Sequence, residues 1–162
     1  MDPRIEPILE LIDPPAGQTP WHGGPSLMGT LRGVDAAQAA WKPAPERHNI
    51  WELAVHTAYW DYAVLRYLNP ETPKGFGRSP ANWAEITDLS EQAWQADKEL
   101  IRQTRQNLLN AIQNFPATRL DEQCKAKKKW TYIQLIQGIA AHETYHIGQI
   151  QLMKRLYAEM HG

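Results

Sequence analysis

The stretch WTYIQLIQGIAAHETYHIGQIQLMKRL, residues 130–156, decides the fold of this protein. It contains no proline, and Thr131 followed three residues later by Gln134 is the pattern of a capped helix start. Apolar residues then recur at helical spacing, so we predict a long helix over residues 131–158. The apolar residues at this spacing are Ile133, Ile136, Ala140, Ile147 and Ile150.

A second long helix is predicted immediately upstream, ending at Pro116. Every other proline lies at or before residue 80, so nothing earlier in this segment breaks a helix. The start falls at Asp88 or Ser90, since either side chain can cap a helix. Apolar residues at steps of seven make this helix amphipathic. They are Trp94, Ile101 and Leu108.

The third long helix lies in HNIWELAVHTAYWDYAVLRYL, residues 48–68. Asn49 is followed at the third position by Glu52, which predicts a capped start. One side of this helix is mainly apolar and also carries His56, so we expect that side to face the protein interior. Two of the three long helices therefore lie in the second half of the chain and the third in the later part of the first half.

The N-terminal part is more interrupted. PRIEPILELI (3–12) and GPSLMGTLRG (24–33) each predict a short helix, and the proline- and glycine-rich segment 14–24 connects them. No segment shows clean alternation of apolar and polar residues except a few residues in KKKWTY (127–132). We therefore predict an all-α fold: one domain over residues 1–162, a four-helix bundle with long loops in its N-terminal half.

The composition excludes several classes of protein. Lys and Arg number 17 against 18 Asp and Glu, a net charge of -1, so no nucleic-acid or anionic-membrane surface is expected. No apolar run approaches the roughly 18 residues of a membrane span. The single cysteine, Cys124, forms no internal disulfide and is expected at the surface. The N-terminus lacks a signal-peptide pattern, so we expect a cytoplasmic protein. We expect its substrate to be a small molecule.

The clearest chemistry lies in the histidines. His142 and His146 are four residues apart on a predicted helix, so both imidazoles project from one face and can bind one metal ion. His56 should point into the same interior, although each histidine could also be a hydrogen-bonded core residue. Three neutral ligands leave an open position, as in catalytic sites, and imidazole suits Zn, Ni, Fe or Co.

HETYH also matches the H-E-x-x-H pattern of zinc peptidases, in which Glu143 would be the general base. That arrangement needs a third ligand after the motif, and residues 147–162 offer only candidates near the C-terminus. We therefore do not expect a peptidase. Glu143 is about 100° round the helix from His142, so we expect it to support the ligands, to lie in the core or to lie at an interface.

A pocket is expected beside the histidines. Trp60 and Tyr59 are candidates for its aromatic lining, and His22 in the connector 14–24 is a candidate substrate contact. His48 is expected to belong to the helix start or to be exposed, and His161 to lie on a frayed end. His22, His48 and His161 are therefore not expected to be metal ligands.

The chain resembles the DinB-like superfamily of bacterial four-helix proteins. The resemblance rests on HNIWELAVHTAYW with His56 and on H-x-x-x-H-x-G-Q-I with His142 and His146, and it covers residues 22–157. It implies an up-down-down-up bundle, a divalent metal bound by the three histidines, and frequent homodimers. Members with assigned activities include thiol-dependent transferases and isomerases that use bacillithiol or mycothiol. The short, interrupted first helix departs from the family pattern.

Two functions are open at this point. The first is a metal-dependent enzyme of thiol-dependent transferase or hydrolase type, in which the ion lowers the pKa of a bound water or thiol. The second is a non-catalytic metal-binding or stress-response protein in which the ion stabilises the bundle by joining two helices. The open coordination position favours the first.

Overall fold

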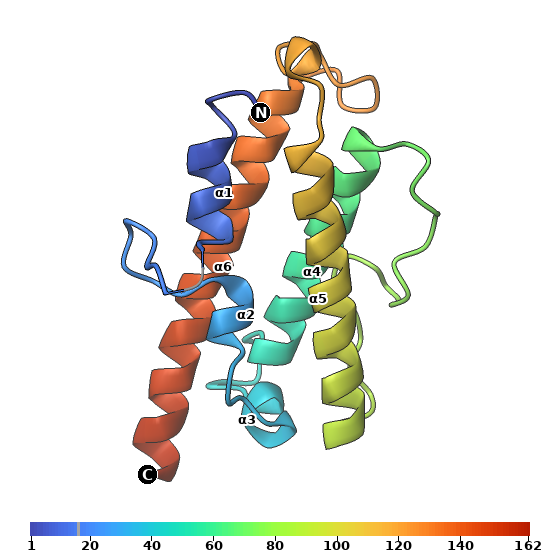
Figure 1. Ribbon diagram of the computed structural model, residues 1–162. Helices are drawn as coiled ribbons and strands as arrows, with labels where there is room; N and C mark the ends of the chain where they lie inside the picture. The colour runs from blue at the N-terminus through green and yellow to red at the C-terminus, as the bar shows by residue number, and fades with distance from the viewer. Residues whose placement is uncertain (16) are drawn as a thin grey trace.

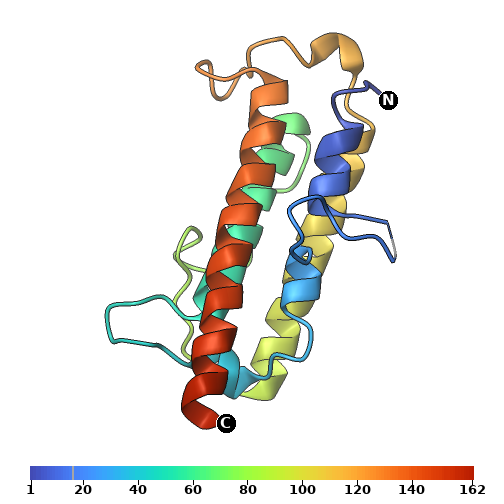
Figure 2. The same ribbon diagram turned by 90° about the vertical axis from the view of Figure 1, so that its left-hand side faces the viewer.

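Three long helices form the body of the molecule (Figure 1). The structure is a computed structural model that describes residues 1–15 and 17–162. The long helices are α4 (Ile50–Leu68), α5 (Glu91–Gln113) and α6 (Tyr132–His161). α4 packs against both α5 and α6. Figures 1 and 2 show that α4 and α5 run in the same direction and that α6 runs in the opposite one.

The starts of the long helices confirm the predicted caps. The Thr131 side chain accepts a hydrogen bond from the Gln134 backbone N–H while the Gln134 side chain accepts from that of Thr131. Asn49 and Glu52 form the same reciprocal box at α4, and Ser90 caps α5. Each cap satisfies backbone N–H groups that a helix start leaves unpaired. α6 extends slightly beyond its predicted end, to His161, whose ring stacks on Tyr157 and meets Trp41 edge-on.

The N-terminal part forms only short helices. They are α1 (Glu6–Ile12), α2 (Leu27–Thr30) and α3 (Ala36–Ala40), with one 3-10 turn, η1 (Ala117–Arg119), after α5. α2 is shorter than predicted at both ends: it begins only after Ser26, whose side chain caps it, and residues 31–33 form a turn that ends at Gly33 with a φ of 74°. α1 and α2 both pack on α6. Among the described residues there is no strand, only an isolated bridge between Gln123 and Thr131, so the all-α prediction is confirmed.

A long connection, residues 69–90, joins α4 to α5. Because these helices run in the same direction, the connection has to return along the length of the bundle, and Figure 1 shows it doing so as the green segment beside α4. Phe76 and Ala84 anchor it in the core, with 6% and 5% of their surfaces exposed. This anchoring brings the loop residues Asn82 and Trp83 against α4.

The core combines two apolar clusters along the bundle. Trp51 and Trp94 are fully buried in one, and their indole N–H groups donate to Asp97 Oδ2 at 2.7 Å and to the Val34 carbonyl at 2.8 Å. The polar edge of each buried indole is thereby satisfied. Cys124 lies in the other cluster with 1% of its surface exposed, which corrects its expected surface position. No described helix has the length and apolar character needed to cross a bilayer.

Candidate metal centre

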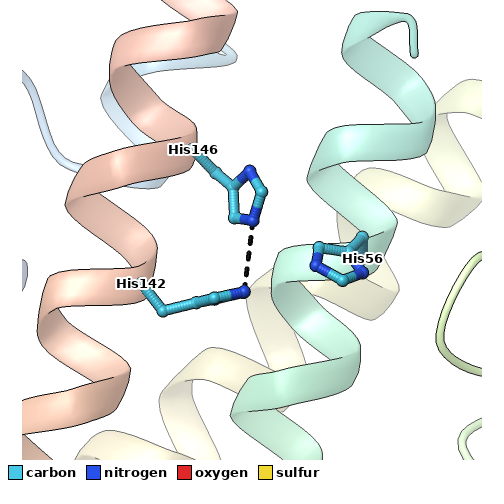
Figure 3. A group of neighbouring side chains, drawn as sticks. All are labelled: His56, His142 and His146. Atoms are coloured by element: carbon cyan, nitrogen blue, oxygen red, sulfur yellow. Dashed lines mark hydrogen bonds between the residues drawn. The ribbon is translucent and has the colours of Figure 1, made fainter. Parts of the chain in front are cut away.

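His56 on α4 meets His142 and His146 on α6 at the seam between the two helices. One ring nitrogen from each histidine lies within 4.8 Å of the others. Figure 3 shows the His146 ring above the His142 ring, with the two ring planes at 76° to each other, and the α4 ring of His56 facing them. The predicted convergence is therefore found in the structure. No further His, Cys, Asp or Glu joins this group in the described part of the chain.

Outer hydrogen bonds orient two of the three rings. His56 Nδ1 lies 2.7 Å from the Asn82 carbonyl oxygen, and His146 Nδ1 lies 2.6 Å from Gln149 Oε1. Both oxygens can only accept, so both Nδ1 atoms carry the proton and donate. The Nε2 atoms of His56 and His146 therefore keep the lone pair that a metal ion requires.

His142 has the arrangement that a metal ion would complete. Its Nε2 lies 3.1 Å from Nε2 of His146, so the two nitrogens face a common point. Two Zn–N bonds of the usual length at a tetrahedral angle place the nitrogens about 3.3 Å apart. The separation of the α6 pair fits two ligands of one ion, and His56 would complete a set of three after a small side-chain movement.

The three rings are kept neutral by their surroundings. Burial lowers the pKa of His142 to about 4, with the neighbouring His146 and His56 rings adding to the effect. Burial also lowers the pKa of His56 and of His146. Since a histidine binds a metal ion only through an unprotonated nitrogen, the rings are ready to bind one at neutral pH.

Trp83 covers the outer face of His56. Its ring stacks on His56 at a centroid distance of 3.7 Å and on His48, on its other side, at 3.8 Å. Sequence reasoning missed Asn82, Trp83 and Gln149. Gln149 follows His146 by one helical turn, so its spacing could have indicated it. The two loop residues carry no such signal, because tertiary packing alone brings them to α4.

The predicted pocket residues are divided between different places. The Trp60 ring packs against His142 at 6.0 Å between centroids. Tyr59 packs on Phe76 and lines a separate hollow that does not include the histidines. His22 is outside the ligand group: its Nδ1 accepts from the Gly24 N–H, and Figure 2 shows its connector on the other side of α6 from residues 69–90.

Glu143 points into the core. Its side chain is fully buried, and its Oε1 pairs with Arg105 of α5, which also donates to the carbonyl of Ile12 at the end of α1. Asp61 of α4 lies beside this pair with no exposed surface. Of the three positions expected for Glu143, the structure favours the core. The carboxylate that a zinc peptidase would use as its base is therefore committed to an ion pair.

Asp61 should make stability pH-dependent. Burial and the nearby Glu143 carboxylate raise the pKa of Asp61 well above its usual range. Above about pH 4 the unfolded chain releases this proton while the folded protein keeps it, so the wild type loses stability as pH rises. We expect Asp61→Asn, which cannot titrate, to gain stability over wild type by up to about 1.4 kcal/mol per pH unit above that point.

Urea unfolding at several pH values between 4 and 7 measures this difference. Asp88→Asn is the control, because a hydrogen bond from the Ser90 N–H lowers the pKa of the exposed Asp88. The Asp88 titration lies at or below the lower end of this range, so the stability difference between Asp88→Asn and wild type should change little from about pH 5 to pH 7. A difference between Asp61→Asn and wild type that does not change with pH would contradict the assignment of a protonated Asp61.

Comparison with known proteins gives one match. A family model described as the DinB superfamily matches residues 25–150, which is more than half of the chain and includes all three histidines. Neither a curated protein nor a solved structure matches the chain.

Proposed function

This chain belongs to the DinB superfamily, and from that premise we propose that it binds one divalent metal ion through His56, His142 and His146. The observation that carries the proposal is the convergence of three neutral imidazoles, two of them with Nδ1 already donating to a fixed acceptor. Zinc, nickel, iron and cobalt all suit such a ligand set. No carboxylate of the described residues supplements it, so the site would keep most of the charge of the ion.

We further propose a metal-dependent enzyme of thiol-dependent transferase or hydrolase type, with a small-molecule substrate and a low-molecular-weight thiol as co-substrate for the transfer. An ion held by three protein ligands supplies a Lewis acid that lowers the pKa of a water or thiol at its open position. His56 and His146 hold their orientation through Asn82 and Gln149, and Trp83 shields one side from water. A hollow beside His142 gives a small molecule access.

A structural role for the ion is the second candidate. The specific observation in its favour is that the ligands come from two helices, since His56 lies on α4 and the other two histidines on α6. An ion bound there would join α4 to α6 and stabilise the folded state by its binding free energy. In that case the protein would be a non-catalytic metal-binding or stress-response protein.

Metal analysis separates these alternatives. Protein purified without an affinity tag should contain, or take up on reconstitution, one divalent ion per chain. A catalytic site predicts a modest fall in melting temperature on chelation and a changed visible spectrum when azide is added to the cobalt-substituted protein. A structural site predicts a large fall and no response to azide. Failure to bind any divalent ion after reconstitution would contradict both candidates.

We also propose that the whole chain is one domain in which α1 and α2 together take the place of the first helix of an up-down-down-up bundle. Both pack on α6, and the chain runs through both in the direction opposite to its direction in α4 (Figure 1). The connector between them replaces the middle of a continuous helix. A cytoplasmic location is part of this proposal, and the buried, unpaired Cys124 is consistent with it.

We propose that the protein is a homodimer that pairs through the outer face of α6. Tyr145, Leu152 and Met160 are 64%, 56% and 69% exposed there, at spacings that keep them on one side of the helix. Light scattering should give the mass of a dimer, and Leu152→Glu should shift it to that of a monomer. Leu89→Glu is the matched control, because Leu89 is 57% exposed but precedes α5. A dimer unaffected by Leu152→Glu would contradict this interface.

A further inference from the structure

A groove runs along the seam between α4 and α6, from His142 to the loop before α6. It has a volume of about 390 Å³, within the range of small-ligand pockets. We propose that this groove binds a small apolar carboxylate, whose charged end lies at Lys127 and whose other end lies at His142. The proposal deepens the proposed function and rests on it, since His142 would be a metal ligand.

The position of the groove follows from helix periodicity. Trp60, Val64 and Tyr67 continue along α4 from His56 at steps of three or four residues, and they form one wall. The other wall is a stripe of α6 that begins at Gln134 and ends at His142. At 1.5 Å per residue these two positions are about 12 Å apart. The groove is thus long enough for a chain of several carbons or for two aromatic rings.

The middle of the groove is open because Gly138 has no side chain. Gly138 lies inside α6, where glycine is less favourable than alanine. A Cβ atom built on Gly138 would meet nothing within 4 Å, so packing does not require glycine at this position. The missing side chain therefore leaves free space between the walls, which are mainly apolar: Trp60, Val64, Tyr67, Trp130, Leu135 and Ile139.

The charge of the groove indicates an anion. No Asp or Glu lines it, and Lys127 is its one formally charged lining residue among those described. The Lys127 ammonium lies 5.7 Å from the centre of the Tyr67 ring and has no ion-pair partner in the described part of the chain. A carboxylate at the end of an apolar molecule would pair with this ammonium while the remainder stays in the apolar middle.

Calorimetric titration with decanoate tests the proposal, with decanol as the uncharged probe. We expect wild-type protein to bind decanoate and Gly138→Leu to weaken that binding by more than roughly tenfold, because the added side chain fills the groove. Gly148→Leu is the matched control: Gly148 also lies in α6, and a Cβ built on it also meets nothing within 4 Å, but it is outside the groove. It should bind decanoate as wild type does.

The charged end is tested by Lys127→Ala. Loss of the ammonium should weaken decanoate binding by roughly tenfold or more, the usual effect of losing a hydrogen bond to a charged group, and should leave decanol binding unchanged. Lys128→Ala is the control, since Lys128 does not line the groove. Decanoate binding that is absent in wild type, or unaffected by either Gly138→Leu or Lys127→Ala, would overturn the proposal.

Metal content measured on the same samples separates the two proposals. If the protein binds an ion but Gly138→Leu has no effect on decanoate, the groove proposal fails and the metal site stands. If no ion binds, but both Gly138→Leu and Lys127→Ala weaken decanoate binding, the groove proposal stands and the proposed function fails. Leucine favours a helix more than glycine does, so Gly138→Leu should keep its fold, which its thermal melt checks.

Discussion

Replacing Arg105 by alanine lowers the free energy of unfolding by about 3–5 kcal/mol, the usual cost of breaking a buried ion pair. Arg105 is 3% exposed and connects three helices: it pairs with Glu143 of α6 and donates to the Ile12 carbonyl of α1 from its place on α5. Alanine removes the only cation beside the buried carboxyl groups of Glu143 and Asp61 among the described residues. The shift of the urea midpoint at constant m-value measures the loss.

Arg102→Ala is the matched control for this prediction. Arg102 lies on the same helix and pairs with Glu99, but the two side chains are 55% and 48% exposed. Water screens an exposed pair, so its loss should cost only a small fraction of what Arg105→Ala loses. Arg105→Met combined with Glu143→Leu should recover much of the stability lost in Arg105→Ala, because no unpaired charge from the pair stays buried. Similar losses for Arg105→Ala and Arg102→Ala would contradict the role given to Arg105.

The long helices and the three histidines could be predicted because their signals are local. A cap such as Thr131 with Gln134 is read over four residues, and the spacing of His142 and His146 covers one helical turn. His56 needed only the further assumption that apolar helix faces meet in a common interior. The spacing of residues along one helix is enough to predict each of these features.

The features that were missed depend on contacts between distant segments. Asn82 and Trp83 reach His56 only because the connection 69–90 has to return along α4. Glu143 pairs with a residue 38 positions earlier in the chain, so its spacing from His142 gave no indication of its partner. Cys124 was expected at the surface because its neighbours are lysines, whereas the turn that holds its N–H against the Trp130 carbonyl directs it inward.

His56→Ala should weaken metal binding by more than about 100-fold. Removing a residue that only hydrogen-bonds to a ligand weakens metal binding by up to about 100-fold, and removing the ligand itself should cost more. His56 is also the one α4 ligand, so without it any ion would be held by two neighbouring residues of α6 alone. Competition with a chromophoric chelator gives the affinity, and elemental analysis gives the stoichiometry. His56→Ala that retains one tightly bound ion per chain would contradict the site.

His48→Ala is the control that separates ligation from the packing of Trp83. His48 stacks on the opposite face of Trp83 from His56, and its side chain is 50% exposed. If the metal requires His56 as a ligand, His48→Ala should bind the ion with nearly wild-type affinity. If His56 served only to pack against Trp83, the two substitutions would have similar small effects. In the metal-free state His56→Ala should melt below wild type, because a ring that is only 6% exposed and its hydrogen bond to the Asn82 carbonyl are lost. The further loss of stability that appears when the ion is present would report the binding free energy supplied by His56.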